Sequence, residues 1–387
     1  MEKTTTKRLL ALDILRGITI AGMILVNNPG TGSKVYAPLE HAEWNGLTPT
    51  DLVFPFFMFI MGISTYISLR KYDFRYSHPS AMKIVRRTIV IYVIGLAIAW
   101  LSLSFRTWHS ADLAGLPFGE RLWKAITNFE HLRLLGVMPR LAICYGVASI
   151  IALTVKHRHI PYLIAILLII YTFILFMGNG FAYDETNILS RVDRAVLGLN
   201  HMYKDHGIDP EGLLSTISAI AHVLIGFCVG KVMMRTHDIH QQIERLFLIG
   251  TILTFGGFLL AYGCPINKKI WSPTYTLVTC GLAASFLAVL IWIIDVKGYK
   301  RWSRFFEAFG VNPLFMYVLG AIFTILLTGI NFNIDGHTKN IRNIIYEYLL
   351  NPLFGDYGGS LAYALLFVAF NWCFGYILYK KKIYIKI

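Results

Sequence analysis

Ten long apolar stretches constrain the fold of this 387-residue chain more than any other feature. A helix of about 20 mostly apolar residues crosses the hydrocarbon core of a bilayer, and it satisfies its backbone polar groups internally. The stretches therefore predict an all-α polytopic membrane protein, a single domain over residues 1–387. The expected spans are Leu9–Asn28, Asp51–Leu69, Ile84–Ser104, Leu134–Val155, Ile160–Gly178, Leu213–Met233, Phe247–Gly263, Pro273–Ile294, Phe305–Ile330 and Ser360–Tyr379.

The composition agrees with a chain that is surrounded by lipid. Apolar residues make up 56% of the sequence and charged residues only 15%, whereas a soluble domain carries about 25% charged residues. The net charge of +14 therefore indicates loops near anionic lipid rather than a nucleic-acid partner. The five cysteines show no CxxC spacing, so no metal site is expected and we interpret them as small core residues.

The distribution of Lys and Arg orients the predicted bundle. If the N-terminus is cytoplasmic, the cytoplasmic segments hold 22 of these residues and the opposite side holds 12. The first count includes Lys3, Lys7, Arg8 and Lys386, and the second includes Lys204. Because cytoplasmic loops are enriched in Lys and Arg, both termini are predicted to be cytoplasmic. For a bacterial chain this places a multi-pass protein in the inner (plasma) membrane, with the first loop outside.

That first outer loop holds the clearest candidates for chemistry. His41 lies in a loop of about twenty residues between the first two spans, and Asn27 and Asp51 end and begin those spans. Histidine is the usual general base near neutral pH, and an Asn amide can donate to an oxyanion. Asp51 or Glu43 would orient the imidazole. Two plainer interpretations remain open, in which His41 is an exposed bystander and Asp51 only caps a helix.

Several polar residues fall within the predicted spans, where the bilayer makes them costly. Arg16 follows Asp13 by three residues, which suits either an ion pair or the capture of an anionic ligand. Arg140, beside Pro139, must lie within the membrane thickness and is expected to face a cavity. Two weaker candidates are His222, in the middle of a span, and the interruption at Asn312-Pro313.

Taken as a set, several motifs resemble the heparan-α-glucosaminide N-acetyltransferase family, including its bacterial NagX-like members. They cover almost the whole chain: Arg8-Leu9 with Leu12-Asp13-Ile14-Leu15-Arg16-Gly17, Met23 and Val26-Asn27; His41-Ala42-Glu43-Trp44-Asn45-Gly46-Leu47-Thr48; Asp51-Leu52-Val53-Phe54-Pro55 to Phe59-Ile60-Met61-Gly62; Gly136-Val137-Met138-Pro139-Arg140-Leu141-Ala142; Asp209-Pro210-Glu211-Gly212-Leu213-Leu214-Ser215; Asn267-Lys268-Lys269-Ile270-Trp271-Ser272; and Asp295-Val296-Lys297-Gly298. Each piece alone is weak, but the combination is specific.

The resemblance implies a membrane-embedded acyltransferase. Such an enzyme takes acetyl-CoA from the cytoplasm and acetylates the free amine of a terminal glucosamine on the far side. The family's active-site histidine carries over to His41, and its asparagine carries over to Asn27, with Asn28 as the adjacent alternative. Asn45 is a second candidate donor to the oxyanion. The family also suggests a homodimer.

A donor such as acetyl-CoA carries phosphates, so basic residues near the cytoplasmic face become candidates for its nucleotide end. From charge and predicted side, these are Arg16, Arg86, Arg87 and Arg304, with Trp302 to stack on the adenine. Arg140, within the membrane, is a further candidate for binding the donor. Two other functions remain open on the sequence alone. One is an amino-sugar transporter, which needs neither acetyl-CoA nor the loop histidine, and the other is an O-acyltransferase of surface glycans.

Overall fold

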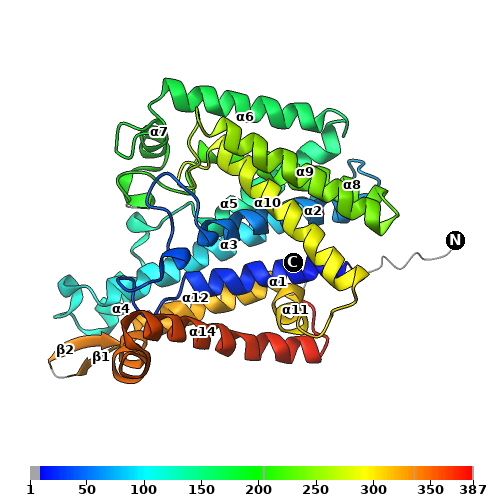
Figure 1. Ribbon diagram of the computed structural model, residues 1–387. Coiled ribbons are helices and arrows are strands. Elements are labelled where there is room, and N and C mark those ends of the chain that lie inside the picture. The colour runs from blue at the N-terminus through cyan, green and yellow to red at the C-terminus, as the bar shows by residue number, and fades with distance from the viewer. Residues whose placement is uncertain (1–8, 204, 335, 386–387) are drawn as a thin grey trace.

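The computed structural model describes residues 9–203, 205–334 and 336–385 and is almost entirely helical (Figure 1). Lys3, Lys7, Arg8, Lys204 and Lys386, which entered the charge count, lie outside the described residues. The helices are α1 Leu10–Val26, α2 Val53–Arg70, α3 His78–Trp108, α4 Phe118–Ile126, α5 Val137–Thr154, α6 Ile160–Met177, α7 Ile188–Leu197, α8 Ser215–Arg235, α9 Ile239–Leu260, α10 Pro273–Ile291, α11 Arg304–Val311, α12 Pro313–Gly329, α13 Ile341–Ile344 and α14 Asn351–Lys380. Strands β1, Asn331–Ile334, and β2, His337–Asn340, form an antiparallel hairpin that the sequence did not predict.

The number of spans is close to the ten predicted. Within the described residues, eight helices are long and apolar enough to cross a membrane, and the bent pair α11–α12 raises this to nine. The remaining predicted span is α1, whose 17 residues stand at the lower end of the roughly 17–25 that suffice. The chain is therefore an all-α polytopic membrane protein, as predicted.

The predicted interruption at Asn312-Pro313 is a sharp bend. Helices α11 and α12 meet there at 89°, because Pro313 cannot donate the backbone hydrogen bond that would continue α11. The Asn312 amide satisfies backbone groups of the C-terminal segment instead: its Nδ2 donates to the Ile383 carbonyl and its Oδ1 accepts from the Ile385 N–H, each over 2.8 Å. The break therefore joins the last segment of the chain to the bundle.

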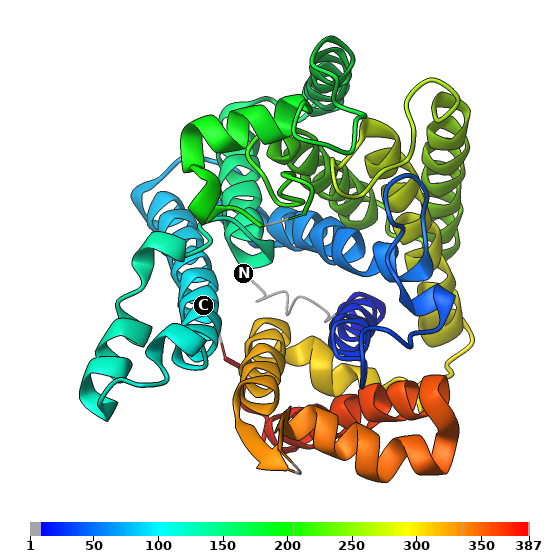
Figure 2. The same ribbon diagram turned by 90° about the vertical axis from the view of Figure 1, so that its left-hand side faces the viewer.

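The long connections gather at one end of the bundle. In Figure 1, α4, α7 and the β1–β2 hairpin all lie at the left-hand end, and Figure 2 looks at the molecule from that end. We call it the outer end, because the charge count predicts that it faces away from the cytoplasm. Helix α1 lies between two groups of helices and contributes to the hydrophobic cluster of each. The first outer loop, which follows the C-terminal end of α1, therefore starts in the middle of the outer end.

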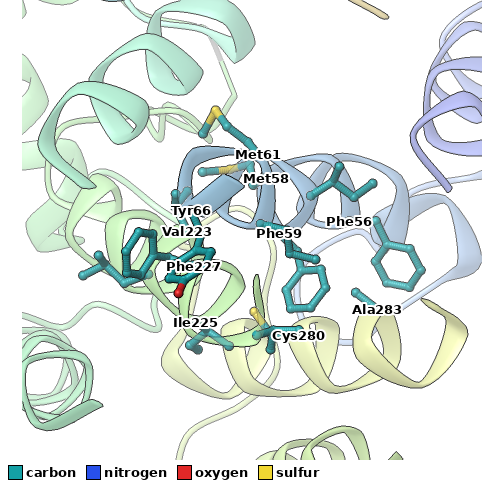
Figure 3. Close-up of a cluster of buried hydrophobic side chains, with 14 of the residues drawn as sticks. Phe56, Met58, Phe59, Met61, Tyr66, Val223, Ile225, Phe227, Cys280 and Ala283 are labelled. Atoms are coloured by element: carbon teal, nitrogen blue, oxygen red, sulfur yellow. The ribbon is translucent and has the colours of Figure 1, made fainter. Parts of the chain in front are cut away.

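The larger cluster is centred on α2, α8 and α10, whose side chains interdigitate in Figure 3. Two glycines let the α2 and α8 backbones touch: a Cβ at Gly62 would lie 2.1 Å from the Val223 carbonyl oxygen, and one at Gly226 would lie 2.2 Å from that of Phe59. Small residues at such contacts are the usual means of packing helices in lipid. His222 adds a polar contact, since its Nε2 lies 2.9 Å from the Pro55 carbonyl oxygen. This contact supports a structural role for that residue.

Candidate active site

The first outer loop returns over the bundle and ends in a short helical turn, Pro49–Leu52, that leads into α2. The turn begins with a reciprocal cap. The Asp51 N–H donates to the Thr48 carbonyl, and Asp51 Oδ2 accepts from the Thr48 N–H and hydroxyl at 3.1 and 3.0 Å. The Ala42 N–H also donates to Oδ2, over 3.1 Å. This one carboxylate oxygen therefore links the helical turn to the segment around Ala42, earlier in the same loop.

The other oxygen of the same carboxylate holds His41. Asp51 Oδ1 lies 2.7 Å from His41 Nδ1, and the Asp51 side chain is completely buried whereas that of His41 is 46% exposed. A buried carboxylate on Nδ1 fixes the ring and leaves Nε2 as the nitrogen that can accept a proton. Asp51 thus makes both contacts that the sequence offered as alternatives. Glu43, the other predicted partner, is exposed and makes no described hydrogen bond to His41.

Lys268 completes this cluster from a distant part of the chain. It lies in the connection between α9 and α10, and its Nζ is 2.9 Å from His41 Nδ1, 3.3 Å from His41 Nε2 and 3.3 Å from Asp51 Oδ1. Burial lowers the pKa of Lys268, and the negative charges of Asp51 and Glu211 oppose that effect only in part. The cluster therefore contains one carboxylate, one imidazole and one amine whose proton is held less tightly than usual.

Neighbouring contacts fix the relative positions of these loops. The Gly46 N–H donates to the Ile266 carbonyl over 2.8 Å, and Asn267 Nδ2 donates to Asn45 Oδ1 over 3.2 Å. Trp44 stacks on Tyr183 with ring centroids 4.5 Å apart. Because its carbonyl oxygen accepts from Asn267, Asn45 keeps its own amide N–H groups for another acceptor. It therefore remains a candidate oxyanion donor.

Asn27 and Asn28, at the end of α1, have different surroundings. Asn28 is buried, donates to the Ile24 carbonyl over 2.8 Å and accepts from the Thr324 hydroxyl, so it joins α1 to α12. Asn27 is exposed and lines a cavity of about 420 Å³ between α1, α3, α5 and α12. In the described part of the chain, neither residue hydrogen-bonds to His41, which is not among the residues lining that cavity. The structure therefore leaves Asn27 beside a cavity and not in the His41 cluster.

A second cavity, of about 940 Å³, continues the first toward the outer loops. The two cavities share a wall that contains two arginines and a histidine: Leu103, Arg106, His131, Arg133 and Tyr203. Arg133 binds Asp209 and Glu211, over 2.5 and 2.6 Å. Since the charge of Glu211 also acts on Lys268, the cavities and the His41 cluster share one electrostatic network.

Arg140 is buried at the outer end of α5. Its Nη2 donates to the Gly212 carbonyl over 3.0 Å and to the Ser215 hydroxyl, and its guanidinium lies over the Trp271 ring, 5.2 Å from the centroid. Neither Nε nor Nη1 has a hydrogen-bond partner among the described residues. Because α5 begins in the outer loops, Arg140 lies at the opposite end of the bundle from the other predicted nucleotide-binding residues.

The contacts of those other residues are with different partners. Arg16 donates to Asp13 and Ser64, each over 2.9 Å, and so joins α1 to α2. Arg87 lies over the Tyr145 ring at 4.7 Å, and Trp302 contacts Phe306. Arg86 and Arg304 are exposed near the inner ends of α3 and α11. No described hydrogen bond, ion pair or ring contact joins these residues into one site.

A buried carboxylate near Arg140 yields a prediction about stability. Burial raises the pKa of Asp193 in α7 to about 6, from 3.8, although its Oδ1 accepts a 2.8 Å hydrogen bond from the Leu213 N–H. The folded state holds the proton more tightly than the unfolded state, so stability falls as pH rises from about 4 to about 6. Asp193→Asn, which keeps the acceptor, should remove that loss, on the order of 2–3 kcal/mol at neutral pH.

Thermal unfolding in detergent at about pH 4 and about pH 7 tests this prediction. The difference between the two midpoints should shrink in Asp193→Asn. Asp112→Asn, which changes an exposed carboxylate in the preceding outer loop, is the matched control and should leave the difference as it is. An unchanged difference in Asp193→Asn would show that this carboxylate is ionised without cost in the folded protein.

Comparison with known proteins identifies the family. The family model described as heparan-alpha-glucosaminide N-acetyltransferase, catalytic, matches residues 8–262. The chain is 28% identical to the human heparan-alpha-glucosaminide N-acetyltransferase over 426 residues, covering 98% of this chain and 60% of the human protein. It is also 28% identical to the mouse protein over 363 residues, covering 82% of this chain and 54% of that relative. The chain thus spans little more than half the length of these relatives.

The matched segment contains His41, Asp51 and Asn27 and ends before Lys268. It covers about two thirds of this chain and includes the loop that the structure closes around His41. The chain belongs to the heparan-alpha-glucosaminide N-acetyltransferase family.

Proposed function

We propose that this chain transfers an acetyl group from acetyl-CoA to the amine of a glucosamine-type sugar. The observation that carries the proposal is the His41–Asp51 pair, with a contact of 2.7 Å, a fully buried carboxylate and an imidazole open to solvent. This is the arrangement that a general base needs, and it occurs in a chain of an N-acetyltransferase family. The names of the relatives supply the chemical class of the acceptor.

In the proposed reaction the sugar amine attacks the thioester carbonyl and loses a proton to His41 Nε2. Asp51 accepts a hydrogen bond from Nδ1–H and stabilises the imidazolium that forms, as the carboxylate of a catalytic triad does. The carbonyl oxygen gains negative charge and needs a donor, for which Asn45 and Asn27 are the candidates. The C–S bond then breaks, and the proton on His41 can pass to the departing thiolate.

The two cavities support an acceptor that enters from the outer end. The smaller cavity lies among the outer ends of α1, α3, α5 and α12, and the larger one is lined by the outer end of α3, by α4 and by polar side chains of several outer loops. A sugar is bound through many hydrogen bonds, which such a lining can supply. We place the acceptor amine beside His41 Nε2 and next to Lys268, whose pKa is also influenced by the charge of Glu211, the partner of the cavity-lining Arg133.

For the donor we propose entry from the cytoplasmic face. The inner ends of α3 and α11 carry Arg86, Arg87 and Arg304, with Trp302 nearby, and these cations suit the phosphates of a nucleotide. The proposed location is the inner membrane of a bacterium, with both termini cytoplasmic and the acetyl group crossing the bilayer. A homodimer is the proposed assembly by analogy with the family.

Sealed inside-out vesicles test the proposed function. Their exterior is the cytoplasmic face, so they are loaded with glucosamine and supplied with labelled acetyl-CoA outside. Labelled N-acetylglucosamine should accumulate in the lumen while no labelled CoA enters. The reason is the charge count, which predicts that the His41 cluster faces the lumen and that the donor site faces the medium.

Vesicles that contain His41→Ala are the control and should accumulate no product. A transporter would instead move glucosamine without acetyl-CoA, and the His41 variant would move it equally well. Sugar flux without acetyl-CoA, combined with no acetylated product, would replace the acyltransferase proposal by the transporter. Product that forms only when acetyl-CoA is inside the vesicles would reverse the proposed direction of transfer.

A further inference from the structure

The ammonium group of Lys268 lies where the amine of an acceptor must come. A base must be within hydrogen-bond reach of the proton it removes, about 2.6–3.2 Å between heavy atoms and often longer before substrate binds. Lys268 Nζ contacts both nitrogens of the His41 ring, at 2.9 Å from Nδ1 and 3.3 Å from Nε2, and Asp51 is paired with Nδ1. Lys268 is a primary amine, as is the proposed acceptor. The chain therefore presents one of its own amines to its own general base.

We infer that Lys268 is a site of self-acetylation, modified from acetyl-CoA when no acceptor sugar fills the site. The inference rests on the proposed function, because it uses the same donor and the same base. It goes beyond that function by assigning a covalent modification to a residue that also contacts the catalytic pair.

The step balances without any further reactant. The neutral Lys268 amine attacks the thioester carbonyl, an N–C bond forms and the C–S bond breaks. The proton lost by the amine passes to His41 Nε2 and then to the CoA thiolate, so the products are an amide on Lys268 and free CoA. The amide is stable under these conditions, so the modified chain is a product and not an intermediate of sugar acetylation.

The neighbouring residue Lys269 shows why only Lys268 is expected to be acetylated. Lys269 forms an ion pair with Asp205 at 2.7 Å and donates to the Tyr183 hydroxyl. Although burial acts to lower the pKa of Lys269, these contacts raise it, whereas burial lowers the pKa of Lys268. Lys269 also has no described contact with His41. Lys269 is therefore less available than Lys268 as a neutral amine, and it has no described contact with the general base. It serves as the internal control for Lys268.

Self-acetylation has two physical consequences for the site. It removes the positive charge beside Asp51 and places an acetyl group in the space of the acceptor amine. Both changes oppose turnover, so the modification should inactivate the enzyme. An acceptor sugar in the site displaces the Lys268 amine from His41 and should protect it. The enzyme would then lose activity when donor is abundant and acceptor is absent.

The test uses purified full-length protein in detergent with isotope-labelled acetyl-CoA and no acceptor. Mass spectrometry of peptides measures the labelled fraction at Lys268 and Lys269 over time. Lys268 should be labelled at least about tenfold faster than Lys269. His41→Ala should slow the labelling of Lys268 by about 10² or more and leave that of Lys269 unchanged, because only the first depends on the base. Added glucosamine should slow the labelling of Lys268 in the parent protein.

The variant Lys268→Arg keeps a positive charge beside Asp51 but does not form a stable amide. Whatever its initial rate, it should not lose activity during preincubation with acetyl-CoA, whereas the parent should lose activity in proportion to the labelled fraction at Lys268. Equal labelling of Lys268 and Lys269, or labelling of Lys268 that persists in His41→Ala, would mean only spontaneous acetylation and would overturn the inference.

A parallel assay of sugar acetylation separates the two proposals. If glucosamine is acetylated while Lys268 stays unlabelled after prolonged incubation without acceptor, the inference fails and the proposed function stands. If neither the sugar nor Lys268 is labelled although acetyl-CoA binds, the proposed function itself fails.

Discussion

Replacing His41 by alanine should lower the rate of acetyl transfer by about 10² to 10⁴, the usual effect of removing a general base. Binding of acetyl-CoA should change little, because the imidazole acts on the acceptor amine and not on the nucleotide. The fold should also survive, since the side chain is nearly half exposed and its removal leaves no buried cavity. Turnover with glucosamine and calorimetric binding of acetyl-CoA, both in detergent, measure the two effects.

The matched control is His109→Ala, which removes another exposed histidine at the outer end of the bundle. Its Nδ1 contacts only a backbone oxygen among the described groups, that of Phe105. This variant should keep the parent rate. If the rate of acetyl transfer by His41→Ala is within tenfold of the parent rate, His41 is not the base. The contacts around Asp51 would then have only the structural role of closing the loop.

Most of the fold could be predicted from the sequence, because a lipid environment restricts which segments can span the membrane. Every spanning segment must be a long apolar helix, and such stretches are visible without any knowledge of their neighbours. The break between α11 and α12 was also visible, because proline marks it. The β1–β2 hairpin was not, because it lies outside the apolar stretches, in a polar loop where no such rule applies.

The site was predicted as far as its parts lie close together in the sequence. His41 and Asp51 are ten residues apart within one loop, so their contact follows from the return of that loop. Lys268 is 227 residues from His41, and only tertiary packing brings them together. Lys268 and Glu211 do fall in stretches that carry the family resemblance. Apart from that resemblance, a charge close to an apolar span was the signal that could have drawn attention to them.

The position of Asn27 shows the opposite limit. Its place at the end of α1 was predicted correctly, but the direction of its side chain depends on how α1 packs against α12. In the structure, Asn27 lines the cavity, and Asn28 makes the contact between α1 and α12. Whether Asn27 or Asn45 stabilises the oxyanion is therefore a question of where the acetyl group lies, and the rates of the two alanine variants decide it.

Replacing Asp51 by asparagine should lower the transfer rate by about 10² or more while leaving the loop closed. The asparagine oxygen can still accept the N–H groups of Ala42 and Thr48 that now reach Oδ2. Its NH₂ group must then face His41 Nδ1, where it donates a hydrogen bond instead of accepting one. The imidazole is thereby held with its proton on Nε2, the nitrogen that has to act as base, and the buried charge that stabilises the imidazolium is lost as well.

The same substitution separates catalysis from structure. If Asp51 acts through His41, Asp51→Asn should lower kcat far more than it changes KM, and combining it with His41→Ala should cost little beyond the larger single effect, because both act on one proton transfer. Glu43→Gln is the matched control, since it neutralises an exposed carboxylate in the same loop that has no described contact with His41. Equal losses in Asp51→Asn and Glu43→Gln, or additive losses in the double variant, would show that Asp51 only caps the turn before α2 and that another group orients the base.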